Sequence, residues 1–403
     1  MGDNAAVLKK TKKIICIYTL VLMAATLLTF GAWKVAVNDT SFALTRALSV
    51  LLVACPIAFA LSAPIAIRFG KKAALKNGLE FDCVENMIDV GKTQIVAMNK
   101  IGTITKGKYV TTDVFSADHI TKSGYNAGVF AGDDELLETA QILAVNIDHP
   151  MAKAIYKHTS ELYVEAEEQL DDCEVHAGGG LEGTIGGTTV RGGSLRFIEE
   201  NAIVPPEIRE RALVFSGQGK TPIYFSKGKR LLGIIAVADS LIDNTARYIA
   251  DLKSMGIKVI MLTGDNEYTG KAIAEKIGIE DVIAEVLPED RDEILRKLSG
   301  RGKVTLIGEK CGCKEVLVMK KSLQDVEASI RLSRSINSII KWNLIISLIY
   351  AVSGAIIALG ALFKAAGLLV DPVAGLLTSL IVGGLVILNS MRLQFMELKD
   401  SNQ

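Results

Sequence analysis

Four short apolar runs in this sequence are each followed at once by residues with polar or charged side chains. In chain order, these residues are Asn99, Asp239, Thr263-Gly264-Asp265 and Gly308-Glu309. In open parallel sheets, chemistry gathers at the carboxyl ends of the strands. If the four runs are strands of such a sheet, these residues are the ones that we expect to take part in it.

The apolar runs themselves have the length and composition of buried strands. They are Gln94–Met98, Leu232–Val237, Lys258–Leu262 and Lys303–Ile307. Helical patterns at Thr245–Ser254 and Glu267–Ile277 lie between the later runs. This alternation predicts a parallel sheet covered by helices, in which the polar residues above gather at the carboxyl ends of the strands.

Residues from about 112 to 220 interrupt the alternating pattern. They contain one helical run around Leu136–His158 and a glycine-rich, strand-like stretch at Gly178–Gly193. We therefore expect a separate small α+β domain inserted into the first domain.

Two pairs of long uncharged stretches flank this polar segment. They are Ile14–Trp33 and Ala47–Ile67 before it, and Trp342–Phe363 and Pro372–Met391 after it. Each is long enough to cross a bilayer as a helix, so the sequence predicts an integral membrane protein. Lys and Arg are concentrated at both termini and beside the polar segment, which predicts that the termini and that segment are cytoplasmic.

Composition limits the other classes of function. Lys plus Arg and Asp plus Glu both number 45, so the formal net charge is zero and no basic excess suggests a nucleic-acid partner. Two of the six cysteines lie in the spans and four in the predicted cytoplasmic segment, where a disulfide framework is not expected.

Several short motifs in this order resemble the heavy-metal-transporting (CPx-type) P-type ATPases. The motifs, listed in chain order, are Cys55-Pro56-Ile57, Asn99-Lys100-Ile101-Gly102-Thr103, His149-Pro150, Gly178-x-Gly180, Thr263-Gly264-Asp265-Asn266, Leu287-Pro288-Glu289-Asp290 and Leu388-Asn389-Ser390-Met391-Arg392-Leu393. The resemblance covers nearly the whole chain from about residue 14. Any one motif is weak, and their joint order between two pairs of spans carries the inference.

The resemblance implies a haloacid dehalogenase-like (Rossmannoid) α/β phosphorylation domain with an inserted α+β nucleotide-binding domain, and four transmembrane helices. The corresponding divisions are 1–91 for two spans and a connector, 92–111 with 221–330 for the phosphorylation domain, 112–220 for the nucleotide-binding domain and 331–403 for the last two spans. The family uses ATP and Mg²⁺ and moves a soft metal ion across the membrane. The resemblance also implies the cell membrane as the location.

The phosphorylation motif departs from the family at its first residue. The family has Asp-Lys-Thr-Gly-Thr, so Asn99 takes the nucleophile's place and Ile101 replaces a threonine. A carboxamide is a poor oxygen nucleophile and carries no charge for Mg²⁺. Matching catalytic positions are Lys100, Thr103, Thr263 and Asp265, with Arg291 where the family has a lysine.

The remaining family positions are only partly kept. His149, Pro150, Gly178 and Gly180 match the adenine pocket, and Asp239 matches an aspartate that lines it; alternatively, His149 starts a helix and the glycines form turns. Cys55 and Pro56 match the transport site, although a lone cysteine in a span also serves packing. Glu309 stands in the Mg²⁺ motif, now Gly308-Glu309-Lys310-Cys311-Gly312-Cys313.

The pair Cys311 and Cys313 has two interpretations. Paired thiols bind thiophilic metals or undergo redox chemistry, whereas two cysteines in a loop can also simply pack in the core. No histidine lies nearby in sequence.

Three functional hypotheses remain open from the sequence. The first is a membrane-bound pseudoenzyme that retains ATP or metal binding and regulates a partner such as an intact ATPase. The second is one half of an ATP-driven metal transporter whose actuator domain, which the family carries upstream of the first span here, comes from a separate chain. The third is a decayed relic. The well-patterned strands and spans favour the first.

Overall fold

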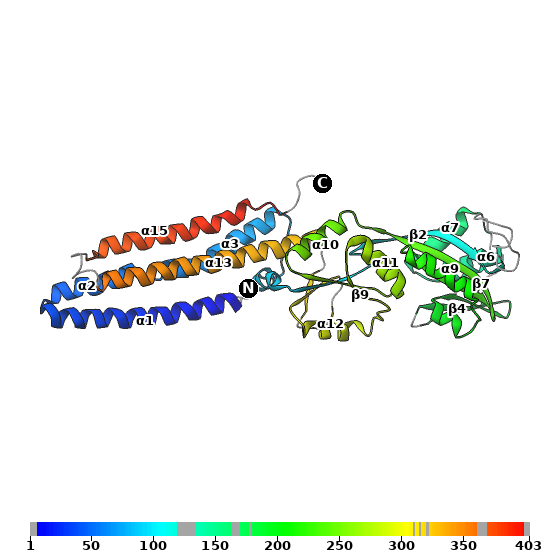
Figure 1. Cartoon of the computed structure of the whole chain (residues 1–403), viewed down its shortest axis with the longest axis horizontal. Coiled ribbons are helices and arrows are strands. Elements are labelled where there is room, and N and C mark those ends of the chain that lie inside the picture. The colour runs from blue at the N-terminus through cyan, green and yellow to red at the C-terminus, as the bar shows by residue number, and fades with distance from the viewer. Residues whose placement is uncertain are drawn as a thin grey trace. The chain divides into compact units, whose positions relative to one another are not determined.

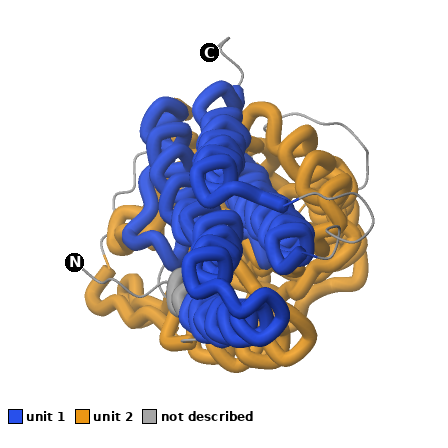
Figure 2. Tube along the Cα trace, turned by 90° about the vertical axis from the view of Figure 1, so that its left-hand side faces the viewer, with its two compact units in different colours: residues 1–93, 324–403 blue, residues 94–323 orange. Residues whose placement is uncertain are grey.

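The computed structural model describes residues 6–118, 134–162, 164, 170–176, 179–308, 311–313, 316–319, 322–360 and 369–398, with side chains from residue 13 onward. The chain forms two compact units (Figure 2). One comprises Met1–Thr93 with Gln324–Gln403, and the other comprises Gln94–Leu323.

The first unit is built from long apolar helices that run beside one another (Figure 1). They are α1 (Ala6–Val37), α2 (Thr40–Val53), α3 (Ile57–Lys76), α13 (Leu323–Ala358) and α15 (Pro372–Met391). Four segments of the described chain are long and apolar enough to cross a membrane, namely Lys13–Val37, Thr40–Lys76, Leu323–Ala358 and Pro372–Phe395. They include the spans expected from the sequence, except that the third expected span ends at Phe363, outside the described residues.

The second span is two helices rather than one. Helix α2 ends at Val53 and α3 begins at Ile57, since Pro56 cannot donate a backbone hydrogen bond and the turn of the helix is broken there. The carbonyl of Ala54 accepts a hydrogen bond of 2.5 Å from the Tyr18 hydroxyl of α1. A side chain from another helix therefore satisfies a backbone group that the break exposes.

A short connector joins the spans to the second unit. It consists of α4 (Val84–Asp89) and the 3₁₀ turn η1 (Val90–Lys92), and a second 3₁₀ turn, η2 (Arg392–Phe395), follows α15. The Ser333 hydroxyl of α13 donates to the carbonyl of Ile88 and accepts from the backbone N–H of Gly91. These buried bonds fix the connector against α13.

The second unit contains a five-stranded, fully parallel sheet with strand order β11-β10-β1-β8-β9. The strands are β1 (Ile95–Asn99), β8 (Lys258–Leu262), β9 (Asp281–Ile283), β10 (Val304–Ile307) and β11 (Leu317–Met319). Helices α10 (Thr245–Ser254) and α11 (Glu267–Ile277) cover one face, and α12 (Arg291–Ser299) covers the other (Figure 1). The predicted parallel sheet, three of its four predicted strands and both predicted helices are confirmed.

One of the four apolar runs belongs elsewhere, and the prediction for it was wrong. Leu232–Val237 lies inside β7 (Arg230–Leu241), which pairs antiparallel with β2 (Thr105–Ser116) and β6 (Thr221–Lys227). A continuous apolar run fits a strand buried on both faces in either kind of sheet, so its pattern could not distinguish them. Asp239 consequently lies within an antiparallel strand and not at the edge of the parallel sheet.

The antiparallel sheet has six strands in the order β2-β7-β6-β5-β4-β3. Its other strands are β3 (Asp172–His176), β4 (Gly180–Ile185) and β5 (Thr188–Gly193). Helices α6 (Asp134–Val145), α7 (Pro150–Glu161), α8 (Leu195–Glu199) and α9 (Pro206–Gly217) pack on it. The expected single helix around Leu136–His158 is two helices, because Pro150 starts a new one. Since this one sheet joins β2, β6 and β7 to β3–β5, the domain limits at 112 and 220 remain a proposal.

Candidate functional site

The segment after β1 makes a tight turn at the carboxyl edge of the parallel sheet. Asn99 is the last residue of β1, and the Lys100 backbone N–H continues the ladder by donating to the Leu262 carbonyl at 3.0 Å. The Lys100 carbonyl then accepts from the backbone of Ile104 and Thr105. Thr103 is buried in this turn, at 5% exposure. The turn holds Asn99 at the end of the central strand.

Lys100 forms a buried ion pair on the β8 side of this turn. Its Nζ contacts Asp265 Oδ2, and the two side chains are only 3% and 7% exposed. The Thr263 hydroxyl donates to the same Oδ2 at 3.0 Å, and the Thr221 hydroxyl donates to Oδ1 at 3.2 Å. Both carboxylate oxygens of Asp265 are therefore engaged, which compensates the desolvation of the charge.

The β10 side of the turn is arranged around Gly308. Gly308 has a backbone φ of +142°, a conformation that residues other than glycine rarely adopt. A Cβ built on it would lie 3.0 Å from Asn99 Nδ2 and 3.6 Å from Arg291 Nη2. The carboxamide of β1 and the guanidinium at the start of α12 thus border the same small space beside Gly308.

Arg291 has no hydrogen-bond partner in that space among the described residues. Its Nε and Nη2 atoms are both buried and unbonded. The Arg291 side chain as a whole is half-buried, and the loss of water from these two charged N–H groups without a hydrogen bond in exchange is costly. The arrangement can be stabilised by an anion beside Arg291, at the amino-terminal end of α12, where the helix dipole also favours negative charge.

Tyr109, on β2, is a residue that the sequence interpretation missed. Its ring lies 5.7 Å from Lys100 Nζ, and its buried hydroxyl has no partner among the described residues. Burial raises the pKa of Tyr109, and the carboxylates of Asp265 and Asp239 raise it further. Tyr109 pairs with Asp239 across β2 and β7, so it connects Asp239 to the ion pair.

Two residues predicted for the site, Glu309 and Gly178, lie outside the described residues. Asp239 Oδ2 accepts from the backbone N–H of Gly107 at 3.2 Å, while its Oδ1 is buried and unbonded. The structure thus brings Asn99, Lys100, Thr263, Asp265 and Arg291 to one sheet edge, with Asp239 linked to them only through Tyr109.

The predicted adenine-pocket residues lie on separate elements. His149 is the amino-terminal cap of α7, where its Nδ1 accepts from the Met151 N–H at 3.3 Å, and Pro150 is the first residue of that helix. Partial desolvation lowers the pKa of His149, so the neutral capping form is favoured. Helix α7 packs on β2 and β7, whereas Gly180 begins β4, three strands beyond β7 in the sheet.

The space beside Gly180, where a ligand could approach the backbone, is occupied by a packed side chain. A Cβ on Gly180 would lie 2.2 Å from the ring of Phe197, so glycine is required for that ring to cover β4. The same ring lies 5.2 Å from the ring of His176, whose buried Nε2 has no partner among the described residues. His176 and Phe197 were not predicted as site residues.

In the spans, Cys55 and Pro56 lie in the break between α2 and α3. Cys55 is half-buried. The transmembrane unit, as far as it is described, holds no group of three His, Cys, Asp or Glu side chains close enough to bind one ion. A metal site there would depend on a single thiol together with carbonyl or hydroxyl groups.

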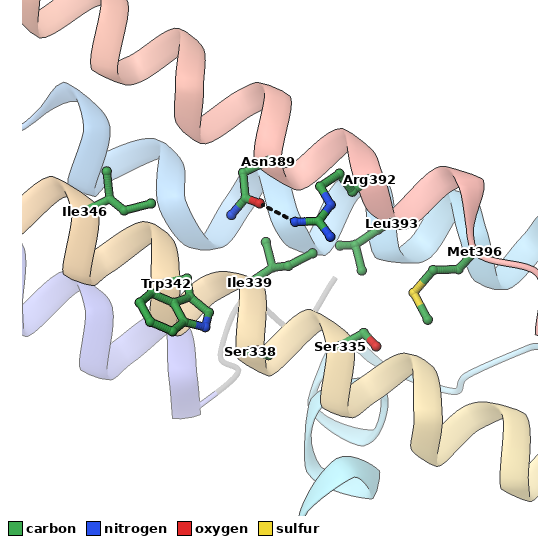
Figure 3. Close-up of a pocket in the computed structure, with 9 residues that line it drawn as sticks. All are labelled: Ser335, Ser338, Ile339, Trp342, Ile346, Asn389, Arg392, Leu393 and Met396. Carbon is green, nitrogen blue, oxygen red and sulfur yellow. Dashed lines mark hydrogen bonds between the residues drawn. The ribbon is translucent and has the colours of Figure 1, made fainter.

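A groove of about 690 Å³ lies between α13 and the end of α15 (Figure 3). Its lining residues are Ser335, Ser338, Ile339, Trp342, Ile346, Asn389, Arg392, Leu393 and Met396. A tryptophan and an arginine beside apolar side chains are typical of the membrane–water interface. The groove offers no carboxylate, imidazole or thiol, so it is not a site of acid–base or metal chemistry.

Comparisons with known proteins agree with the fold. The model of the haloacid dehalogenase-like hydrolase family matches residues 95–309, which is more than half of the chain. The chain is 32% identical, over 93% of its length, to the copper-transporting ATPase 2 of Rhizobium meliloti (strain 1021), and 27% identical, over 89%, to the copper-exporting P-type ATPase B of Archaeoglobus fulgidus. It covers 47% and 53% of those proteins, so it spans about half the length of the relatives it matches.

The crystal structure of a zinc-transporting PIB-type ATPase in its E2.Pi state superposes with a TM-score of 0.66 at 24% identity. That superposition covers 94% of this chain and 62% of the other. The chain belongs to the heavy-metal-transporting P-type ATPase family. Its parallel sheet has the haloacid dehalogenase-like fold, and its four long apolar helices make it an integral membrane protein.

Membership of the P-type ATPase family gives the site geometry a chemical meaning. The resemblance to the family implies that Asn99, at the end of β1, takes the nucleophile's place, and the structure puts its carboxamide beside the space next to Gly308. The Asn99 carboxamide cannot attack phosphorus as a carboxylate does, whereas Arg291 can still bind phosphate oxygens. ATP and Mg²⁺ use belongs to the family; at this edge the described residues fit the anion better than the cation.

Proposed function

We propose that this chain is a membrane-embedded pseudoenzyme of the heavy-metal P-type ATPase family, which binds a phosphate-bearing ligand without becoming phosphorylated. Asn99 carries this proposal, because it is held at the nucleophile's position by an otherwise ordered turn. A decayed relic would not be expected to keep the buried Lys100–Asp265 pair or the Gly308 conformation, since neither is needed by an unfolded or nonfunctional chain.

Among the described residues, which exclude Glu309, no nearby carboxylate is well placed to replace Asn99 as the nucleophile. Asp265 is bonded to Lys100, Thr263 and Thr221 through both oxygens, so attack would break its ion pair. Asp239 lies in β7 and accepts a backbone hydrogen bond. Both observations support a site that binds and does not transfer.

The ligand that we propose is ATP, held by its phosphates near Arg291 and Lys100 and by its base in the antiparallel-sheet domain near His149. Mg²⁺ binding is proposed to be impaired, because Asn99 contributes no charge. Cys55 and Pro56 are proposed to keep at most a weak affinity for a soft transition metal. We further propose the cell membrane as the location, with both termini and the soluble unit in the cytoplasm.

The competing proposal is that the chain is one half of an ATP-driven metal transporter and works with a separately encoded actuator half. It would require that phosphorylation occur at another residue. The proposed pseudoenzyme instead acts on a partner within the bilayer, such as an intact ATPase. Phosphorylation of the chain separates the two.

The test is incubation of the detergent-purified chain with γ-labelled ATP and Mg²⁺, followed by acid quenching. We expect no hydroxylamine-sensitive label on the wild-type chain, because no acyl phosphate forms. The variant Asn99→Asp restores the carboxylate, and Asn99→Gln is its matched control, with an amide of greater length. Label on the wild type that hydroxylamine removes would refute the pseudoenzyme.

Binding is measured separately by the thermal shift that ATP or inorganic phosphate gives to the same preparation. A stabilisation of the wild type that disappears in Arg291→Gln supports a phosphate-binding pseudoenzyme. Absence of any shift with either ligand would contradict the binding half of the proposal. Label on Asn99→Asp would add that a single atom disables phosphoryl transfer.

A further inference from the structure

The loop after β10 and the first turn of α12 bring three metal-ligating side chains together. Asp292, Cys311 and Cys313 each offer one ligand atom, and these atoms all lie within 4.8 Å of one another. It is the only group of three such side chains found in the described part of the chain. We propose that Asp292, Cys311 and Cys313 bind a thiophilic divalent cation of the Zn²⁺ class.

The spacing of the three atoms fits such an ion. Zinc–sulfur bonds of about 2.3 Å in a tetrahedral site put two sulfur atoms about 3.8 Å apart. The ligand atoms therefore need to close by no more than about 1 Å, which side-chain rotation in a loop can supply. A fourth position is left for water or another donor.

The surroundings of the three residues hold the donors in place. The Gly312 backbone N–H donates to Asp292 Oδ2 at 3.0 Å and so orients the carboxylate. A Cβ on Gly312 would lie 2.7 Å from that oxygen, so another residue at this position would push the carboxylate away from the thiols. Cys313 is buried at 6% exposure, and its thiol contacts the Asp292 carbonyl at 3.2 Å.

The donor set selects the class of metal. Two thiolates favour Zn²⁺ and Cd²⁺ over Mg²⁺ and Ca²⁺, which prefer oxygen ligands. The carboxylate favours a divalent ion over Cu⁺, for which a purely sulfur-based set is better suited. Each thiol releases its proton to solvent when the ion binds, so metal affinity is expected to rise with pH.

The ion would join two segments that border the candidate phosphate site. Asp292 follows Arg291 directly, and Cys311 follows Gly308 by three residues. Binding would therefore fix the first turn of α12 to the loop after β10. The alternative is that both cysteines only pack, since Cys313 belongs to the core beneath α12 and Cys311 lies against it.

The experiment titrates Cd²⁺ into the full-length, reduced chain in detergent. The readout is the ultraviolet charge-transfer band of thiolate bound to Cd²⁺. We expect one Cd²⁺ per chain with this band, and displacement by Zn²⁺. The double variant Cys311→Ser/Cys313→Ser should lose the band, and Asp292→Asn should keep it with at least about tenfold weaker affinity. Gly312→Ala should also weaken binding.

Two other cysteines serve as matched controls. Cys173→Ser removes an exposed thiol of β3, and Cys55→Ser removes the thiol in the spans. Both should leave the band unchanged. A band that survives in the double variant, or that only Cys55→Ser removes, would overturn the proposal, as would its absence from the wild type.

Folding is checked by the thermal unfolding of each variant without metal. If the double variant unfolds, Cys311→Ser alone changes only a half-buried thiol and serves in its place. None of these readouts depends on ATP or on Asn99, so loss of this site and loss of the proposed phosphate site are distinguished.

Discussion

The two sides of the turn after β1 differ in how well their charges are satisfied. On the β8 side, Lys100, Asp265 and Thr263 form a closed network in which both carboxylate oxygens have partners. On the β10 side, Asn99 and Arg291 border the space beside Gly308, and Arg291 has two buried nitrogen atoms without partners among the described residues.

This difference indicates which parts of a catalytic site also serve the fold. The β8 network is buried, so removal of any charge would leave its partner unpaired in the core. On the resemblance to the family, the acid expected at the end of β1 and the Mg²⁺ motif expected after β10 would contribute to phosphoryl transfer more than to packing. They can therefore change without unfolding the sheet, and in this chain they hold Asn99 and Cys311-Gly312-Cys313.

The largest effect is expected from Asp265→Ala on the β8 side. This substitution leaves the Lys100 ammonium buried and unpaired, so the second unit should lose about 3–5 kcal/mol of stability. Thermal unfolding of the detergent-purified chain measures the change. Glu280→Ala, which breaks an exposed ion pair with Lys253, is the control and should cost less than about 1 kcal/mol. Equal effects of the two variants would contradict the distinction between the two sides.

On the β10 side, Asn99→Asp should stabilise the chain. The new carboxylate would face the Arg291 guanidinium, which has no ion-pair partner among the described residues, and a hydrogen bond to a charged group contributes about 1.5–3 kcal/mol. The gain should be present at neutral pH and disappear as the pH falls below about 4, where an aspartate is protonated. Unfolding of wild type and variant across this range measures it. A gain that persists at low pH would mean that charge is not its origin.

Arg291→Met removes the unpaired charge and keeps most of the side-chain volume. In the absence of anions we expect stability to stay unchanged or to rise by about 1 kcal/mol, because a desolvated charge is lost. The phosphate-induced thermal shift should vanish in the same variant. If Arg291→Met lost several kcal/mol of stability without phosphate, Arg291 would have an anionic partner in the folded protein. The charges on the β10 side would then be paired, as they are on the β8 side.

The smallest effect at neutral pH is expected from Tyr109→Phe, since the hydroxyl it removes is buried and bonds to none of the described residues. The folded pKa of Tyr109 is raised, chiefly by burial and then by Asp265 and Asp239. Stability of the wild type should therefore fall as the pH rises above about 10, where the unfolded tyrosine ionises and the folded one does not. Stability measured from pH 8 upward should fall less in Tyr109→Phe. If the stability of wild type and of Tyr109→Phe fell equally as the pH rose, the Tyr109 hydroxyl would be in contact with water.

Sequence patterns predicted the parallel sheet and the edge at which Asn99, Thr263 and Asp265 meet. They succeeded because Lys258–Leu262 and the helices that follow alternate in the local way that βα units require. They failed for Leu232–Val237, since a buried run looks the same in both sheets. Tyr109 and the role of Gly180 under Phe197 escaped prediction because each depends on a residue distant in sequence.

By itself, the sequence determined the four apolar stretches, the order of strands and helices around β1, and the carboxamide at position 99. Each of these is a local property of composition or spacing. Only the tertiary structure decided that two buried nitrogen atoms of Arg291 have no partner among the described residues beside Gly308, and that Asp292 meets Cys311 and Cys313. Those facts depend on contacts between α12 and the loop after β10, and no local pattern specifies which side chains a loop and a helix bring together.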